Sequence, residues 1–173
     1  MANTMVKIDS VTVGSGGQAS IEFTSIPGTY TDLMVLCSIR TNRSSTGDYV
    51  FTSLNGVRET HGRQIWVSGT TLYYLPVSDN ALFPTPSTNT AASVFSNAEL
   101  YLPSYTRTVA KSMIINSVAI DTNGSPQGTS TSGFLYNSGS PASNAITSIT
   151  FAPRFGSLIL QHSTAYLYGI KNT

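Results

Sequence analysis

Short runs in which apolar and polar residues alternate one by one constrain the fold of this 173-residue chain more than any other feature. In residues 19–24, Ala19, Ile21 and Phe23 alternate with polar neighbours. A period of two places the apolar side chains on one face of a β-strand, whereas an amphipathic helix needs apolar residues three and four positions apart. No segment keeps a helical period for two clean turns. The chain is therefore expected to be all-β.

The expected strands are short, and most are bounded by Gly, Pro, Asn or Ser. Residues 5–13 interrupt their alternation at Asp9 and Ser10, which predicts either a strand with a β-bulge or two shorter strands. Residues 33–39 are almost continuously apolar, as is typical of a central strand. Residues 14–17 (GSGG) are expected to form a hairpin turn. Further strands are expected at 19–24, 49–54, 64–67, 71–75, 98–102, 112–120, 133–136, 146–151 and 164–170.

Many short strands and no amphipathic crossover helix favour a single antiparallel β-sandwich, jelly-roll-like, over residues 1–173. Two segments lack periodicity and are expected to be long loops, at 78–92 and 121–132. The first of them contains apolar residues beside prolines, which predicts an interface; the alternative is that they cap an open end of the sandwich. These residues are Leu82, Phe83, Pro84 and Pro86.

Charge is scarce in this sequence, at 10% of the residues, compared with about 25% in an ordinary soluble domain. The 25 Ser and 23 Thr residues are expected to fill the water-facing positions instead. The nine Lys and Arg residues form no basic run, which argues against nucleic-acid binding. Neither a signal peptide nor a membrane-spanning stretch is visible, so synthesis in the cytoplasm is expected. With so few charges, electrostatic repulsion between molecules is weak, which favours association and a role in an assembly.

The sequence offers little material for catalysis, metal binding or cofactor binding. Only His61 and His162 could act as bases at neutral pH, and the motif Gly-x-Ser-x-Gly does not occur. The eight carboxylates are isolated from one another, and the single Cys37 lies within an apolar run, where a buried small side chain is expected. We therefore expect neither an enzyme nor a bound metal or cofactor.

Three aromatic residues, Trp66, Tyr73 and Tyr74, could supply a platform for a sugar ring. Because neighbouring residues of a strand point to opposite faces, one of the two tyrosines is expected to be exposed or at an interface. Tyrosine and tryptophan are also common in sheets and protein interfaces, and this interpretation is favoured over the sugar platform.

Several segments together resemble a group of small virion structural proteins of tailed bacteriophages, including cyanophages. The resemblance is carried by residues 19–33 (ASIEFTSIPGTYTDL) with the apolar strand that follows, and by residues 163–170 (STAYLYGI), which look like that group's last strand. Asn55-Gly56, residues 99–103 (ELYLP) and residues 146–153 (ITSITFAP) fit in the same order. These are strand and turn signatures, with no catalytic motif among them.

The resemblance implies a virion component, on the capsid or on the tail. A capsid cement or decoration protein is favoured, bound to the major capsid protein or other virion proteins and self-associated, with a trimer favoured. The alternative is a tail-fibre or baseplate-associated head domain that binds the host receptor, which could be a glycan. The expected interface residues are Leu82, Phe83, Pro84, Pro86, Trp66, Tyr73 and Tyr74.

Overall fold

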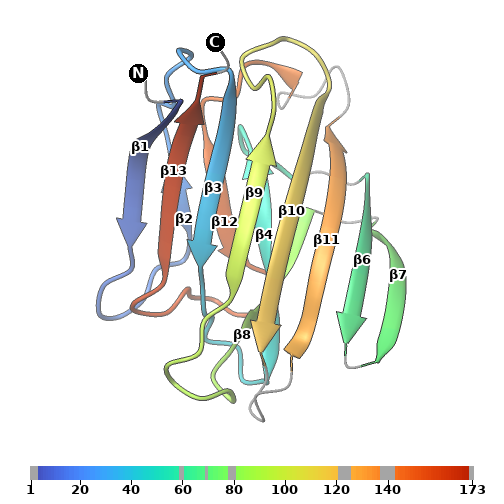
Figure 1. Ribbon diagram of the computed structural model, residues 1–173. Helices are drawn as coiled ribbons and strands as arrows, with labels where there is room; N and C mark the ends of the chain where they lie inside the picture. Colours follow the sequence, from blue (N-terminus) through green and yellow to red (C-terminus); the bar gives the residue numbers. More distant parts are fainter. Residues whose placement is uncertain are drawn as a thin grey trace.

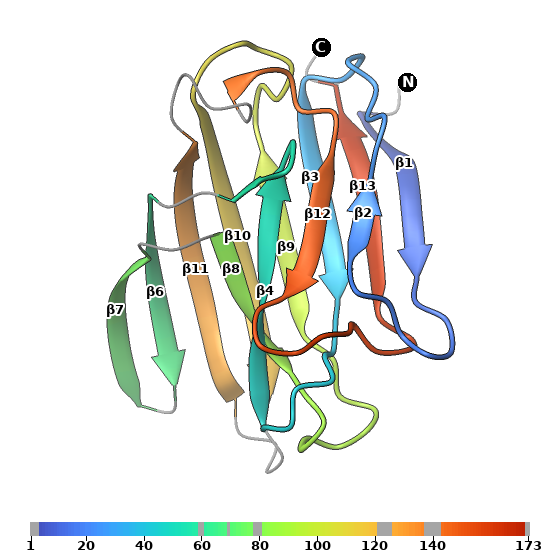
Figure 2. The same cartoon turned by 180° about the vertical axis from the view of Figure 1, so that it is seen from behind.

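The computed structural model describes residues 4–58, 61–68, 70–77, 81–120, 126–136 and 143–171, which form an antiparallel β-sandwich (Figures 1 and 2). The large sheet contains, in spatial order, β1 (Met5–Thr12), β13 (Thr164–Ile170), β3 (Asp32–Ser38), β9 (Asn97–Leu102), β10 (Lys111–Ile120), β11 (Pro126–Tyr136), β6 (Gly62–Ser68) and β7 (Thr71–Val77). The small sheet contains β2 (Ile21–Phe23), β12 (Ile149–Pro153), β4 (Gly47–Leu54) and β5 (Val57–Arg58), with β8 (Ala81–Pro86) also paired to β4. The predicted all-β antiparallel sandwich is confirmed, and it is jelly-roll-like in that β1 to β4 alternate between the two sheets.

The core lies between the sheets and is made by the alternation seen in the sequence. In β3, Leu33, Val35 and Cys37 point inward and are buried, while the residues between them are half-buried on the opposite face. The rings of Phe83 and Phe151 meet edge to face within the core, with centroids 6.2 Å apart. Burial of a large apolar side chain contributes roughly 1.5–3 kcal/mol, so this inner layer is the main source of stability.

The first strand confirms the predicted bulge, because the register of β1 on β13 shifts between Lys7 and Asp9. The prediction of a hairpin turn at residues 14–17 is wrong. This turn leads from β1 in the large sheet to β2 in the small sheet. Gly17 has a φ of +76°, and a Cβ there would lie 2.7 Å from the carbonyl oxygen of Ile159. Glycine is thus needed for a crossing between sheets rather than for a hairpin.

Both predicted long loops contain strands, which corrects their boundaries. β8 occupies residues 81–86 of the first, and β11 begins at Pro126 within the second. Two prolines concealed β8 in the sequence, yet they are compatible with it because, among the described strands, β8 pairs with β4 alone and so lies at a sheet edge. Residues 78–80 and 121–125 lie outside the described residues.

Four buried charged residues hold the loops at the ends of the sandwich. The Arg40 guanidinium donates hydrogen bonds to carbonyls of residues 88–94, among them that of Thr90 at 2.9 Å. Asp48 accepts hydrogen bonds from the Thr41 hydroxyl and from backbone N–H groups of the loop that follows β12. Lys111 donates to three carbonyls, and Asp32 accepts from Tyr101 and from a backbone N–H. Burial lowers the pKa of both Arg40 and Lys111.

The two sheets differ in width, and this difference leaves part of the large sheet uncovered. β8 packs on β10 and β11. The hairpin of β6 and β7 extends to the side, beyond the strands of the small sheet (Figure 2). An edge-to-face contact between Trp66 of β6 and Tyr49 of β4, with ring centroids 5.7 Å apart, links the hairpin to the small sheet.

Candidate interaction surface

The outer face of the eight-stranded large sheet is a broad surface that no other described strand covers (Figure 1). Because alternate residues point inward, the remaining ones line up in rows that cross the strands on the outside. One row crosses seven neighbouring strands from β13 to β7, and the register places polar groups at its centre and apolar groups toward its ends. It consists of Tyr166, Leu36, Glu99, Asn116, Thr131, Ile65 and Tyr74.

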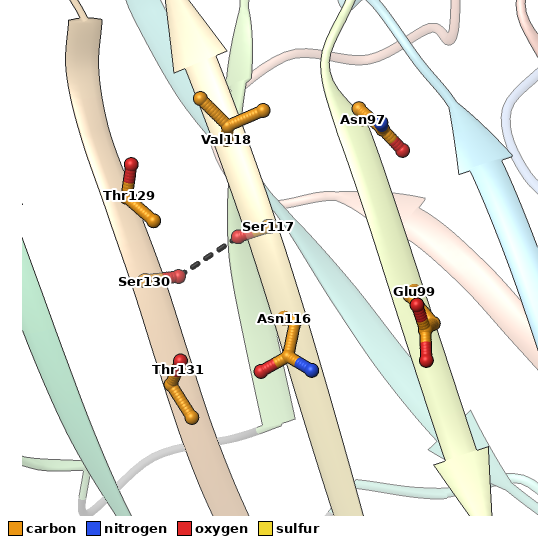
Figure 3. A pocket seen from close by; sticks show the side chains of 8 residues that line it. All are labelled: Asn97, Glu99, Asn116, Ser117, Val118, Thr129, Ser130 and Thr131. Carbon is orange, nitrogen blue, oxygen red and sulfur yellow. Dashed lines mark hydrogen bonds between the residues drawn. The ribbon is translucent and has the colours of Figure 1, made fainter.

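A shallow hollow of about 240 Å³ lies at the centre of this face, over β9, β10 and β11 (Figure 3). Its outward residues are Asn97 and Glu99 from β9, Asn116 and Val118 from β10, and Thr129 and Thr131 from β11. Beneath it, the buried hydroxyls of Ser117 and Ser130 form a hydrogen bond of 2.8 Å between β10 and β11. The hollow thus offers amide, carboxylate and hydroxyl groups on a rigid sheet.

Three outward polar side chains of the hollow take no part in hydrogen bonding within the part of the chain that the structure describes. Those of Asn97, Glu99 and Asn116 make no hydrogen bond or ion pair with any other residue that the structure describes. In contrast, Asn42 accepts hydrogen bonds from two backbone N–H groups at 2.8 and 2.9 Å, and Asn55 does the same at 2.9 and 3.2 Å. The side chains of the hollow are therefore available to a partner.

A second hollow, of about 530 Å³, adjoins the first and is more aromatic. The two share Asn97, and the second is lined on its other side by Phe95, Tyr166 and Tyr168. Tyr166 is 37% exposed. Amide and carboxylate groups beside tyrosine rings are the combination that can bind a hydroxyl-rich ligand through hydrogen bonds and ring contacts.

The β6–β7 hairpin carries a cluster of the exposed large apolar side chains found among the described residues. On the outer face, Ile65 and Val67 of β6 lie opposite Tyr74 and Leu72 of β7. Leu72 and Tyr74 are each 68% exposed, and Ile65 and Val67 are 47% and 41% exposed. Large apolar side chains gathered in this way are typical of a protein interface rather than of a solvated surface.

The three aromatic residues singled out in the sequence all lie on this hairpin. Tyr73 and Tyr74 point to opposite faces, and both are exposed, Tyr73 at 47%. Trp66 is half-buried against Tyr49 and lies so close to Gly128 that a Cβ there would overlap the indole ring. An interface at these three residues stays a prediction, and Trp66 also has a structural role beside it.

The other expected interface residues lie inside the molecule. Phe83 is 1% exposed in the core, and Leu82, on the other face of β8, is 4% exposed. Pro84 and Pro86 are buried in the same strand. The prediction of an interface in a long loop is therefore wrong for these residues, because the segment forms a strand in which residues 82–86 are buried.

The two histidines and the cysteine considered for catalysis or metal binding lie in different parts of the fold. His61 and His162 are both exposed. His61 directly precedes β6, and His162 lies in a turn before β13, with a φ of +71°. Cys37 is buried in β3, where burial raises the pKa of its thiol. Among the described residues, no group of three or more His, Cys, Asp or Glu side chains could hold a metal ion. None of the described segments forms a helix long and apolar enough to span a membrane.

Comparison with protein-family models, with curated proteins and with solved structures found no match for this chain. The outer-face hollow was missed at the sequence level, although the alternation in residues 98–102 and 112–120 marks Glu99 and Asn116 as outward positions. The alternation does not predict that these two positions face the same hollow.

Proposed function

We propose that this chain is a non-enzymatic structural protein of a tailed-bacteriophage virion, most simply a capsid cement or decoration protein. The observation that carries the proposal is the uncovered outer face of the large sheet, where exposed apolar side chains such as Ile114 and Leu135, each 48% exposed, lie among uncharged polar groups. Several segments resemble phage virion proteins, and this resemblance suggests that the face is covered by other proteins of a virion.

A cement protein stabilises a shell by binding the assembled lattice in preference to free subunits, which shifts the equilibrium toward assembly. Many copies on one closed shell also add avidity, so each contact need only be moderate. Lys7 and Arg63 are charged residues on the edge portions of the outer face, and Glu99 is a charged residue at its centre. Contacts made by the apolar and hydroxyl groups between them depend little on salt, unlike surface ion pairs.

The decisive experiment counts the copies of this chain in purified particles of the phage that encodes it. Hundreds of copies would agree with a capsid protein, a few would indicate the tail, and absence from the particles would overturn the proposal. The docking face is tested by Ile114→Ser combined with Leu135→Ser, which should reduce the number of copies without unfolding the protein. Val109→Ser is the matched control, because Val109 is 51% exposed but lies in a loop outside the face.

The hollow on β9, β10 and β11 favours a second candidate, a tail-associated head domain that binds a glycan of the host surface. Its support is the group of Asn97, Glu99 and Asn116 side chains, which no described residue engages, beside the ring of Tyr166. Under this alternative, Asn116→Ala should abolish binding to host-surface polysaccharide and slow phage adsorption. Unchanged binding and adsorption would remove the hollow from consideration.

A further inference from the structure

The large sheet ends in two strands, β1 and β7, and the two edges are built differently. β1 has the features that prevent an edge from pairing with another strand: a bulge, and exposed charges at Lys7 and Asp9. β7 has neither a charge nor a break in its register with β6. Among the described residues it pairs with β6 alone. The edge at β7 therefore remains able to accept another strand.

Pro76 identifies which backbone groups of β7 face the open edge. A proline has no N–H, so in a paired strand its nitrogen points away from the partner. Pro76 lies opposite Arg63 of β6. In an antiparallel ladder the direction of the N–H and C=O groups alternates from residue to residue. The backbone groups of Leu72 and Tyr74 thus face outward with Pro76, and those of Tyr73 face β6.

We propose that β7 pairs antiparallel with β7 of a second copy of this chain, about a twofold axis that passes beside Tyr73. In this register Leu72 of one copy lies opposite Tyr74 of the second, and each residue exchanges both backbone hydrogen bonds with the other. The outward N–H groups of both edges are then satisfied. Pro76, which has no N–H to offer, lies outside this set of hydrogen bonds.

The side chains agree with this register on both faces. On the outer face, Leu72 and Tyr74 already form an apolar group with Ile65 and Val67. The twofold axis joins this group to its copy, which makes one continuous apolar strip. On the opposite face the two exposed Tyr73 rings come together at the axis, as a cross-strand aromatic pair.

A second copy is the occupant that the charges favour. Residues 70–77 contain no charged side chain, so pairing the segment with itself brings no like charges together. The charged residue on the adjacent strand, Arg63, lies opposite Pro76, at the end of the paired segment rather than at the axis. The pairing is twofold, so it predicts a dimer where the sequence led us to expect a trimer.

The register can be tested with single cysteines, because the native Cys37 is buried at 5% exposure and gives little background. Tyr73→Cys places two thiols at the axis in a pair without backbone hydrogen bonds, where Cα atoms are roughly 4.5 Å apart and a disulfide can form. Mild oxidation is expected to convert this variant to a covalent dimer. Leu72→Cys and Tyr74→Cys are the matched controls, since their thiols are displaced along the strand, and little dimer is expected from either alone.

The oligomeric state of the unmodified protein provides the independent measurement, by sedimentation equilibrium over a range of concentrations. The mass of a dimer is expected, and Leu72→Pro should restore the monomer, because it removes an outward N–H as Pro76 does while leaving the bonds to β6 in place. Circular dichroism and thermal unfolding would verify that this variant is folded. A monomer or a trimer for the native chain, or equal crosslinking of all three cysteine variants, would overturn the proposal. Particle binding is not involved, so failure here leaves the proposed virion role standing.

Discussion

The polar residues that hold the loops and those that point out into the outer-face hollow are of the same chemical kinds, but they differ in hydrogen bonding. The first group is hydrogen-bonded within the protein, and the second group has no such partner among the described residues. Asp48 is 2% exposed and accepts hydrogen bonds from a hydroxyl and several backbone N–H groups. Glu99, also a carboxylate, is half-buried on the sheet face and has no such partner among the described residues. In a chain with only eight acidic residues, this difference separates a carboxylate that the fold uses from one that no described residue engages.

The largest expected effect follows from removing the Asp48 carboxylate. Asp48→Ala leaves the backbone N–H groups of Tyr49, Phe155 and Gly156 without their acceptor. Hydrogen bonds to a charged group contribute about 1.5–3 kcal/mol each, and the buried donors carry a desolvation cost once unpaired. We expect the free energy of unfolding to fall by about 3 kcal/mol, measured by urea denaturation. Asp48→Asn, which retains one acceptor oxygen, should lose less; equal losses would show that the hydrogen bonds are not the cause.

A smaller loss is expected from Lys111→Met. The ammonium of Lys111 donates to the carbonyls of Val109 at 2.9 Å and of Ser143 at 3.0 Å, and also to that of Arg107. Methionine keeps the length of the side chain but leaves these carbonyls unpaired. Since desolvation of the lysine already offsets part of the gain, the free energy of unfolding should fall by about 2 kcal/mol at neutral pH.

The pH dependence of the same variant gives a second readout. Burial lowers the pKa of Lys111 in the folded protein, so between that value and the ordinary pKa of 10.5 the unfolded chain binds more protons. Stability from this group therefore rises with pH across that window. The gap between the wild type and Lys111→Met should widen as the pH increases toward 10.5. Tyrosines such as Tyr49, whose pKa is raised by burial, titrate in both proteins and cancel in the difference. A gap that narrows would contradict the assignment.

The strands and the loop contacts differ in how far the sequence predicts them. Alternation alone predicted most strands, and a bulge in β1 as one of two alternatives, because it is a local property of the chain. It missed β8, since Pro84 and Pro86 are tolerated there only by virtue of an edge position that the sequence does not reveal. In the sequence, Arg40 and Asp48 cannot be told from charged residues of an exposed loop. Their buried hydrogen bonds depend on segments distant in the chain, such as residues 88–94, whose position the sequence does not reveal.

The candidate site was predictable to a similar, partial extent. Adjacent positions on one strand predicted that one of Tyr73 and Tyr74 is exposed, and both are exposed. The first hollow required the pairing of β10 with β9 and with β11, which are consecutive strands. The second hollow required the pairing of β3 with β9 and with β13, which joins segments far apart in the chain. No local pattern encodes the order of such strands, because the alternation is the same for any partner.

The smallest expected effect completes the contrast with Asp48. Glu99→Gln replaces the carboxylate of the hollow by an amide of nearly the same shape, and no described residue loses a hydrogen bond by the change. The free energy of unfolding should therefore change by no more than about 0.5 kcal/mol, in the same urea experiment that reports the loss in Asp48→Ala. A loss above about 1 kcal/mol would mean that Glu99 is part of the machinery that holds the fold. An unchanged stability combined with altered binding of a partner would show that this carboxylate serves only the surface.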